Sequence, residues 1–344
     1  MSPATETEVL VVGGGPVGLA AAIEARLAGF DVTVLEPRAG VIDKACGEGL
    51  MPGALPALAR LGVTPRGFAL HGVDYRDGRR SAQHRFVGGP GLGVRRTTLH
   101  AALRDRAEEL GVRTVAQRVE TVEQDATGVT AAGIRASWLL AADGLHSTVA
   151  RVTGLHRGAP TARRRYGLRR HYTVEPWSDL IEVHWTPLGE LYVTPTADGM
   201  VGVAVLTRQG VHFDEALAAC PELAARVVAH DPVTELRGAG PFRQTTRART
   251  RGRVLLVGDA SGYVDALTGE GIRIGVAQAR AAVEAVMVGD AAGYERAWLD
   301  ATRDFRSLTG ALVRAATSPA RRLIVPVAHA APGIFASAVE RLAR

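Results

Sequence analysis

The sequence is poor in lysine and in cysteine. Lys44 is the only lysine among 41 basic residues, and the remainder are arginine. The two cysteines, Cys46 and Cys220, are too few for a disulfide framework or a cysteine-rich metal centre, so we expect no metal. A chain with so few cysteines suits a reducing compartment, and we expect it in the cytoplasm.

Long hydrophobic runs are also missing. The longest apolar stretch, residues 323–339, is interrupted by Pro326, His329 and Pro332, and a membrane span needs about 20 unbroken apolar residues. The N-terminus shows no secretion signal before Gly13. We therefore expect no transmembrane segment, and we interpret the apolar stretch as a cap over the core or a substrate cavity in preference to a membrane-surface contact. The oligomeric state is not predicted.

The net charge of +6 comes with arginine clusters at residues 163–165, 169–170 and 243–253. Such clusters can mark nucleic-acid contact. No helix-turn-helix, zinc-finger or aromatic RNA-binding signature accompanies them, so we expect no nucleic-acid partner. A solvated face, or attraction for a phosphorylated cofactor, explains the charge better.

The chain begins with the pattern of a strand, a glycine turn and a helix. Residues 9–12 are apolar, residues 13–18 read Gly-Gly-Gly-Pro-Val-Gly, and an apolar helical pattern follows as far as Gly29. Residues 31–36 have the composition of a second strand. The pattern predicts a βαβ unit.

The glycines of this turn have separate physical roles. Gly13 permits the sharp turn, Gly15 lets backbone amides approach a pyrophosphate, and Gly18 lets the helix pack closely on the strand. Pro16 begins the helix, whose N-terminus favours negative charge. Glu36 stands where a carboxylate accepts hydrogen bonds from ribose hydroxyls, which suits FAD or NAD and disfavours the 2′-phosphate of NADP.

The middle of the chain changes character. Between about residues 154 and 240, strand-like runs at 180–185, 190–193 and 200–205 are separated by turn residues, which indicates an antiparallel sheet inserted into the nucleotide-binding domain. Helical patterns return over residues 272–286 and 297–313. The predicted boundaries are a discontinuous nucleotide-binding domain at 1–72, 94–155 and 241–290, a substrate domain at 73–93 and 156–240, and a C-terminal helical segment at 291–344.

Three further segments carry a family resemblance. Arg96 opens a helical pattern, an apolar strand ends in Asp143-Gly144, and another strand ends in Gly258-Asp259 shortly before a Thr-Gly-Glu-Gly-Ile loop. Together with the first glycine turn, this order resembles the flavoprotein superfamily of para-hydroxybenzoate hydroxylase and geranylgeranyl reductase over nearly the whole chain. The resemblance implies an α/β fold, with a Rossmann-like FAD-binding domain, an inserted antiparallel-sheet substrate domain and C-terminal helices.

The resemblance also implies roles for single residues. Arg96 and Asp259 are expected to contact the pyrophosphate and ribityl region of FAD, where a guanidinium can neutralise phosphate and a carboxylate can accept a hydroxyl bond. Asp143 is expected to contact FAD and a pyridine nucleotide, although an aspartate that only forms a turn remains an alternative.

The loop before the last helical pattern is expected to face the flavin ring. Backbone amides at Gly269, Gly271 and Ile272 lie where a helix begins, so they can stabilise negative charge on the pyrimidine edge of reduced flavin. A plain glycine-rich turn is the alternative.

Residues 43–52, which include Cys46 and Glu48, look more like geranylgeranyl reductases than aromatic hydroxylases. Arg273 supports this likeness, because many hydroxylases have asparagine there. The sequence departs from the group at Ala266, which replaces a proline, and at residues 190–195, where an aromatic cavity motif is degraded. The usual long-chain isoprenoid is therefore not expected as the substrate. Halogenation is disfavoured because the Trp-x-Trp-x-Ile-Pro block and the later lysine of flavin-dependent halogenases are missing.

Three functions remain open. The favoured one is an NAD(P)H-using monooxygenase that hydroxylates or epoxidises a small apolar or aromatic intermediate. The second is a reductase of carbon–carbon double bonds, in which Cys46 would be the proton donor and Glu48 would orient the substrate or the flavin. The alternatives are that Cys46 is a small buried apolar residue and that Glu48 is a surface or turn glutamate. The third is a cyclase with a non-redox FAD. No second dinucleotide fingerprint exists, so NADH or NADPH would bind transiently over the FAD domain.

The substrate pocket is expected between the flavin and the inserted sheet. The sheet around His184, Tyr192 and Val203 is expected to form its wall, and the candidate substrate residues are His171, His184 and Tyr192. An ordinary strand residue is the alternative for each of the three. A strand pattern misread by one residue would exchange the two faces of the sheet.

Overall fold

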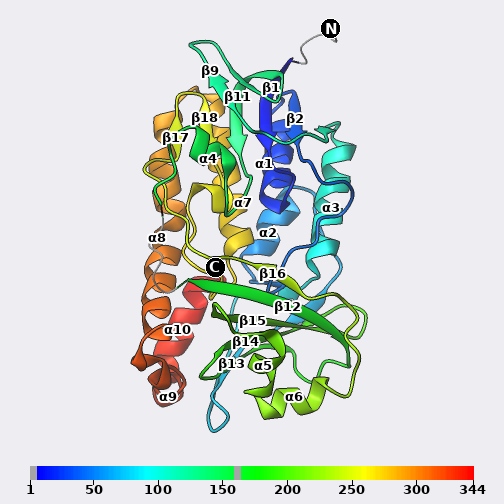
Figure 1. Cartoon of the computed structure of the whole chain (residues 1–344), viewed down its shortest axis with the longest axis vertical. Helices are drawn as coiled ribbons and strands as arrows, with labels where there is room; N and C mark the ends of the chain where they lie inside the picture. Colours follow the sequence, from blue (N-terminus) through cyan, green and yellow to red (C-terminus); the bar gives the residue numbers. More distant parts are fainter. Residues whose placement is uncertain (1–5, 159–163) are drawn as a thin grey trace.

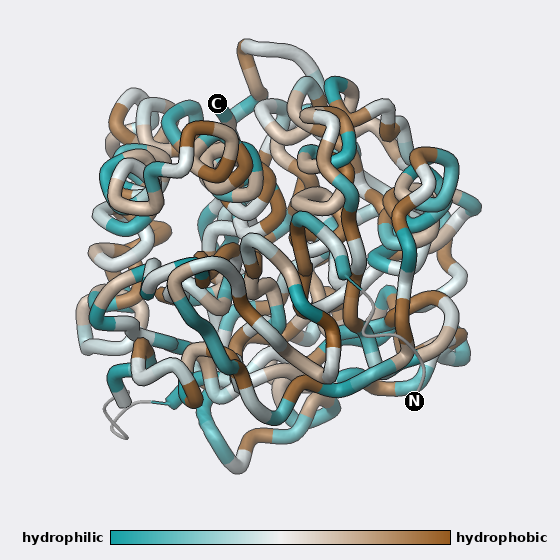
Figure 2. The backbone as a smooth tube through the Cα atoms, turned by 90° about the horizontal axis from the view of Figure 1, so that it is seen from above, coloured by the Kyte–Doolittle hydropathy of each residue, from teal (hydrophilic) through white to brown (hydrophobic). Residues whose placement is uncertain are grey.

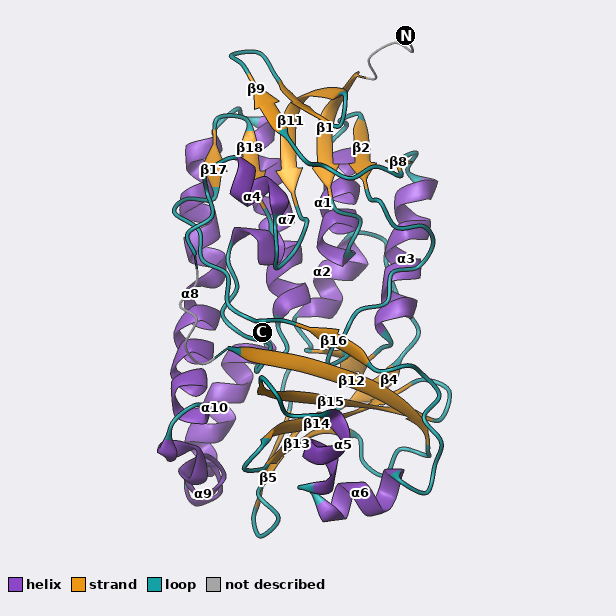
Figure 3. Cartoon of the chain, viewed as in Figure 1, coloured by secondary structure: helices purple, strands orange, loops and turns teal. Residues whose placement is uncertain are grey.

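The computed structural model describes residues 6–158 and 164–344. Two large sheets form the body of the protein, one above the other in Figure 1, and helices cover both (Figure 3). Figure 2 shows that hydrophobic stretches recur along the segments that run through the interior. The resulting core consists of buried aliphatic side chains on both faces of each sheet.

The first sheet contains the predicted βαβ unit. Its strands are β1 (Glu6–Val12), β2 (Val32–Leu35), β8 (Arg113–Val115), β9 (Val122–Gln124), β10 (Val129–Ala131), β11 (Ile134–Ala141), β17 (Thr250–Arg251) and β18 (Val254–Leu256). The main order is β17-β18-β11-β1-β2-β8, and β18, β11, β1, β2 and β8 run parallel. Residues 9–12 are all apolar, without the alternation of a half-exposed strand. This pattern suits β1, which is buried on both faces as strands of parallel sheets are.

The second sheet has seven strands. They are β5 (Gly72–Arg76), β6 (Ser81–Arg85), β12 (Arg165–Thr173), β13 (Leu180–Trp185), β14 (Gly189–Thr196), β15 (Met200–Arg208) and β16 (Arg237–Ala239), in the order β16-β12-β15-β14-β13-β5-β6. All pairs are antiparallel except β13 with β5. A smaller sheet, β3-β7-β4, consists of β3 (Gly49–Leu50), β7 (Gly91–Gly93) and β4 (Phe68–Leu70).

Helices separate into three groups. On the first sheet lie α1 (Pro16–Leu27), α2 (Ala54–Arg60), α3 (Arg96–Glu109), α7 (Gly271–Met287) and α8 (Ala291–Ala316) on one face and α4 (Thr148–Val152) on the other. Behind the second sheet lie α5 (Phe213–Ala218) and α6 (Pro221–Val227). The C-terminal group contains α9 (Ile324–Ala330) and α10 (Pro332–Ala343), with the 3-10 turns η1 (Gly258–Ser261) and η2 (Pro319–Leu323) earlier in the chain.

The α/β fold with an inserted antiparallel sheet and C-terminal helices is confirmed. The long helix α8 runs beside both sheets and leads into the C-terminal group (Figure 1). Within the described ranges no single helix is long and apolar enough to cross a membrane. The residue ranges Pro319–Ala330 and Pro332–Ala343 reach the required length and composition only as a pair, which is bent by 103°.

Candidate active site

A cavity of about 440 Å³ lies between the two large sheets. The parallel strands β1, β11 and β18 end beside it, as expected for ligand sites in open α/β sheets. Its walls therefore combine loops of the nucleotide-binding part with one face of the inserted sheet. Twelve predicted residues line it: Gly13, Gly15, Pro16, Cys46, Glu48, Arg96, Asp143, Tyr192, Asp259, Gly269, Gly271 and Ile272.

The first glycine turn has the geometry expected of a pyrophosphate cradle. Gly13 has φ +102°, and a Cβ there would lie 2.5 Å from the carbonyl oxygen of Ala142. A Cβ on Gly18 would lie 1.8 Å from the carbonyl oxygen of Gly13, so helix and strand pack without room for a side chain. Gly15, the N-cap of α1, is open except for Arg96. Free amides at the N-terminus of α1 thus adjoin the cavity.

The carboxylate of Glu36 has hydrogen-bond partners within the protein. Its carboxylate accepts the N–H of Gly14 at 2.9 Å and is paired with Arg38 through two guanidinium bonds. Burial would raise the pKa of Glu36, but these hydrogen bonds hold it below its ordinary value. Arg38, and not Glu36, lines the cavity. A ribose would therefore reach Glu36 only if Arg38 moves aside.

Two cations and one carboxylate meet near the cradle. The terminal nitrogen of Arg96 lies 3.9 Å from the position of a Cβ on Gly15, and the buried Nε of Arg96 has no hydrogen-bond partner. Lys44 also lines the cavity, and burial, together with the charge of Arg96, lowers the pKa of its ammonium group. Burial raises the pKa of Asp259, although Lys44 and Arg96 oppose the shift. These groups form an unsaturated site for an anion and a hydroxyl donor.

Asp143 stabilises the turn with one carboxylate oxygen and can bind a ligand with the other. Its Oδ2 accepts the N–H of Val149 at 3.0 Å, whereas its buried Oδ1 has no hydrogen-bond partner. Burial raises the pKa of this carboxyl against the hydrogen bonds from Ser147 and Val149. Asp143 can therefore form the turn and contact the cofactor at the same time, as the two interpretations of the Asp-Gly signature require.

The loop before α7 adjoins the cavity with free backbone amides. Gly269 has φ +72°, and α7 begins at Gly271 without a side-chain cap. Glu270, which belongs to this loop, is buried and lines the cavity, and it pairs with Arg273 at 2.5 Å. Burial raises the pKa of Glu270 to about 7 in spite of that pair. The dipole of α7 therefore presents its positive end where negative charge is expected on reduced flavin.

The loop that carries Cys46 is tied to the inserted sheet. Desolvation raises the pKa of the partly buried Cys46 thiol. Glu48 has φ +61° and is nearly fully buried, which corrects the alternative that it is a surface glutamate. Its Oε1 accepts the Arg96 N–H at 2.8 Å, and its Oε2 lies 2.5 Å from Nε2 of His171. Glu48 thus joins the start of α3 to β12.

Arg169 is a site residue that the sequence interpretation missed. It is 1% exposed, donates to Asp43 and to the carbonyl oxygen of Lys44, and lies 3.1 Å from Nδ1 of His171. The expectation of a solvated arginine face is wrong here, because β12 alternates and Arg165, Arg169 and His171 share its buried face. The alternation of residues along β12 was the sequence signal that could have identified Arg169 as buried. Arg163 of the same cluster lies outside the described residues.

The inserted sheet presents Tyr192 to the cavity but not His184. Tyr192 lines the wall and donates its hydroxyl to the carbonyl oxygen of Leu267 at 2.7 Å. On β13 the residues facing the cavity are Ile181 and Val183. Successive strand residues point to opposite faces, so His184 points away, toward α6, and its assignment to the substrate pocket is wrong. Val203 is likewise packed on the far face.

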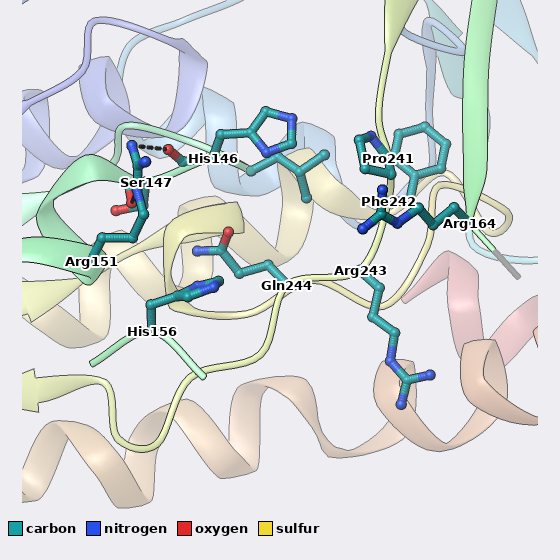
Figure 4. Close-up of a pocket in the computed structure, with 10 residues that line it drawn as sticks. His146, Ser147, Arg151, His156, Arg164, Pro241, Phe242, Arg243 and Gln244 are labelled. Atoms are coloured by element: carbon teal, nitrogen blue, oxygen red, sulfur yellow. Dashed lines mark hydrogen bonds between the residues drawn. The ribbon is translucent and has the colours of Figure 1, made fainter. Parts of the chain in front are cut away.

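A second cavity of about 230 Å³ adjoins the first and shares Leu145, His146 and Phe242 with it. Figure 4 shows His146, His156 and Gln244 between Arg151 on one side and the Pro241–Phe242 segment on the other. Arg164 and Arg243 complete a lining rich in cationic groups. This cavity suits a negatively charged ligand.

The open cradle at Gly15, the unpartnered Arg96 and the free Oδ1 of Asp143 fit a dinucleotide cofactor. Comparison with known proteins agrees with this fit. Residues 6–288 match a family model described as an FAD binding domain. Menaquinone reductase of Mycolicibacterium smegmatis is 29% identical over 79% of this chain and 74% of its own length.

Other relatives differ in their named activities. Digeranylgeranylglycerophospholipid reductase 2 of Methanosphaera stadtmanae is 28% identical over 78% of this chain and 74% of its own. Para-nitrophenol 4-monooxygenase of Pseudomonas sp. WBC-3 is 28% identical over the same shares. The structure of the p-nitrophenol 4-monooxygenase of Pseudomonas putida DLL-E4 superimposes with a TM-score of 0.80, at 23% identity, over 98% of this chain and 95% of that one. The chain belongs to the FAD-binding domain family of FAD-dependent oxidoreductases.

Proposed function

We propose that the protein reduces a carbon–carbon double bond in a small apolar substrate. The observation that carries the proposal is the Cys46 thiol, which lies in the cavity wall with a pKa raised by burial and therefore keeps its proton at neutral pH. FAD, when bound and reduced, supplies a hydride equivalent to one carbon of the double bond. Cys46 donates the proton to the other carbon and is reprotonated from solvent, so the substrate gains two protons and two electrons in total.

The surroundings of Cys46 suit this task. The Cys46 sulfur accepts the N–H of Glu48 at 3.4 Å, and Glu48 is held in turn by His171, so the thiol has a defined place. An apolar wall excludes water from the space beside it. That wall comprises Met51, Val73, Ile181, Val183, Leu206, Phe242, Leu267, Val339 and Leu342.

The named activities of relatives support a reductase. The alignments with menaquinone reductase and with digeranylgeranylglycerophospholipid reductase each cover more than three quarters of this chain. The degraded aromatic motif at residues 190–195 argues for a substrate that differs from the long isoprenoids of the group. The substrate we propose is therefore apolar and compact.

Monooxygenation, which the sequence interpretation favoured, is the second candidate. Its support is the likeness to para-nitrophenol 4-monooxygenase, which covers 78% of this chain at 28% identity. An apolar cavity beside the flavin serves an oxygenase equally well. The proton-holding Cys46 has no assigned role in that reaction, and for this reason we rank it second.

The proposed reductant is NADH or NADPH. The cationic cavity of Figure 4 adjoins the flavin cavity, and Arg151, Arg164 and Arg243 there supply charge for the phosphates of a transiently bound pyridine nucleotide. Reduction of the flavin by either nucleotide supports an oxidoreductase. If neither nucleotide bleaches the flavin, with or without substrate, a separate electron donor or the cyclase alternative is favoured.

We also propose that the substrate reaches the cavity from a membrane surface. Val339 and Leu342 of α10 line the cavity, while Leu323, Val327 and Ile334 of the same C-terminal group are 59%, 55% and 71% exposed. Exposed apolar side chains beside arginines are typical of interfacial helices. The apolar stretch would then cap the cavity and also contact lipid.

An anaerobic turnover experiment distinguishes the candidates. The enzyme is reduced with NADH or NADPH, and prenyl quinones and short isoprenoids are added without oxygen. Reoxidation of the flavin with a product in which a carbon–carbon double bond has gained two hydrogens supports the reductase, whereas reduction of a quinone to its quinol alone does not. A product formed only with oxygen, carrying label from ¹⁸O₂, supports the monooxygenase and contradicts our proposal.

The Cys46→Ala variant tests the proton donor. We expect it to slow flavin reoxidation by substrate by about 10²- to 10⁴-fold, the usual contribution of a positioned acid. The rate of flavin reduction by the nucleotide should not change, which serves as the internal control. Equal loss of both rates would indicate a structural role for Cys46.

A further inference from the structure

A cluster of metal-ligating side chains lies on the side of the inserted sheet that faces away from the flavin cavity. His184 on β13, Cys220 at the N-cap of α6 and Glu222 in the first turn of α6 bring one nitrogen, one sulfur and one oxygen atom within 4.8 Å of one another. His184 and Cys220 are buried, whereas the Glu222 side chain is 46% exposed. No step of the proposed reaction uses these residues.

Two of the three distances within the cluster match those of a tetrahedral zinc site, and the third, from Sγ of Cys220 to the Glu222 carboxylate, is within 4.8 Å. Nδ1 of His184 lies 3.2 Å from Oε1 of Glu222 and 3.4 Å from Sγ of Cys220. Zinc bonds of ordinary length at tetrahedral angles place nitrogen and oxygen about 3.3 Å apart and nitrogen and sulfur about 3.5 Å apart. The ligands therefore need little movement to surround an ion.

The second ring nitrogen of His184 is held as in known metal sites. Nε2 lies 3.0 Å from Oε2 of Glu182, whose other oxygen accepts the Trp177 indole N–H at 3.0 Å. A carboxylate on the far nitrogen orients a ligating histidine and makes it a better donor. This contact is independent of the three candidate ligands, and it leaves Nδ1 directed at Cys220 and Glu222.

The surroundings favour a cation. Asp74, Glu182 and Glu222 place three carboxylates around the cluster. The nearby guanidiniums are those of Arg76, which pairs with Asp74 and Glu182, and of Arg226, which lies over the Trp177 ring.

We propose that His184, Cys220 and Glu222 bind one Zn²⁺ ion, with the fourth position open to solvent beside Glu222. Sulfur, imidazole and carboxylate together are the ligand set that zinc accepts. The ion would fasten the N-terminus of α6 to β13, directly behind Ile181 and Val183 of the cavity wall. The low cysteine count argued against a multi-cysteine centre, and this site needs only one cysteine.

Cobalt substitution tests the site. The holoenzyme is dialysed against a chelator, titrated with Co²⁺ and examined by difference spectroscopy, in which a thiolate-to-cobalt band and tetrahedral d–d bands at wavelengths beyond the flavin absorption are expected. One equivalent of Co²⁺ should bind, and Zn²⁺ should displace it and raise the melting temperature. Absence of the thiolate band, or uptake far from one equivalent, overturns the proposal.

Variants identify the ligands. Cys220→Ser should abolish the thiolate band, whereas Cys46→Ser, which removes the other cysteine, should leave it unchanged. Glu182→Gln should weaken cobalt binding about 10- to 100-fold, as loss of an outer carboxylate does elsewhere. Retained FAD absorbance verifies the fold. If Cys220→Ser does not fold, the half-exposed Glu222→Gln replaces it and should weaken binding; a band unaffected by either change contradicts the assignment.

Discussion

The Oε2 atom of Glu48 lies 2.5 Å from Nε2 of His171, although 123 positions separate the two residues in the chain. The same carboxylate accepts the backbone N–H of Arg96, so one side chain connects the Cys46 loop, the start of α3 and β12. Glu48 adopts φ +61°, a conformation that non-glycine residues hold only when their surroundings enforce it. The contact fixes the two parts of the cavity wall relative to each other.

Replacing Glu48 with alanine should therefore destabilise the protein. His171 would remain buried without its carboxylate partner, while Arg169 keeps Asp43, and leaving a buried polar group without its partner costs about 1–3 kcal/mol. Urea unfolding measures the difference. Glu123→Ala, at an exposed glutamate of β9, should change the free energy of unfolding by no more than about 0.5 kcal/mol. A similarly small effect at Glu48 would contradict the structural role.

Gly18→Ala should abolish FAD retention. The new Cβ would lie 1.8 Å from the carbonyl oxygen of Gly13, so α1 must move and the cradle must open. Gly333→Ala is the matched control, because no atom lies within 4 Å of that Cβ position in α10. The flavin content of the two purified variants, from their absorption spectra, gives the comparison. Full flavin content in Gly18→Ala would contradict the geometry of the turn.

Arg96→Met should weaken FAD binding by about 10- to 100-fold. Hydrogen bonds to charged groups contribute about 1.5–3 kcal/mol, and Arg96 has an unused guanidinium beside the cradle. Flavin fluorescence on dilution of the holoenzyme measures the release. Arg95→Met removes the neighbouring arginine, which does not line the cavity, and should leave the affinity unchanged. Equal effects of both substitutions would exclude a specific contact.

Glu270→Gln should change how the stability of the flavin-free protein depends on pH. Burial raises the pKa of Glu270 from 4.5 to about 7. Between these values the folded protein holds a proton that the unfolded chain releases, so the contribution is present below pH 4.5 and is lost as the pH rises through about 7. This difference in pKa between the folded and unfolded states corresponds to roughly 3 kcal/mol in the free energy of unfolding. Urea unfolding at pH 5 and about pH 8 should show a smaller difference in Glu270→Gln than in wild type or in the exposed Glu120→Gln control.

Ile334→Asp should reduce binding to anionic liposomes if the C-terminal group contacts a membrane. Ile334 is 71% exposed on α10, and a carboxylate there would oppose insertion among charged headgroups. Co-flotation with vesicles that contain phosphatidylglycerol measures the binding. Val288→Asp places the same charge at the C-cap of α7, where the side chain is 75% exposed, and should have no effect. Wild-type protein that stays unbound at low salt would contradict the proposal.

The local patterns of the sequence were sufficient for the elements that build the cofactor site. Residues 9–12, the turn from Gly13 to Gly18 and the loop at Gly269 have their expected structures because each depends on near neighbours and on glycine at positions with little room or a positive φ. Arg96 and Asp259 line the same cavity, as the family resemblance implied. Asp259 reaches the cavity from the carboxyl end of the parallel strand β18, whereas Arg96 reaches it from the start of α3.

Side-chain direction and pairing over long distances were decided by the tertiary structure. Tyr192 faces the cavity and His184 faces α6. The composition of the two strands does not specify these directions, because they depend on the register in which the strands pair. The burial of Arg169 and the link from Glu48 to His171 depend on which segments fold against each other, whereas Arg38 pairs with Glu36 only two positions away. The sequence by itself thus determined the cofactor and the fold, since both are encoded in short continuous motifs. Only the packing of distant segments decided which polar side chains surround the substrate and which meet behind the sheet.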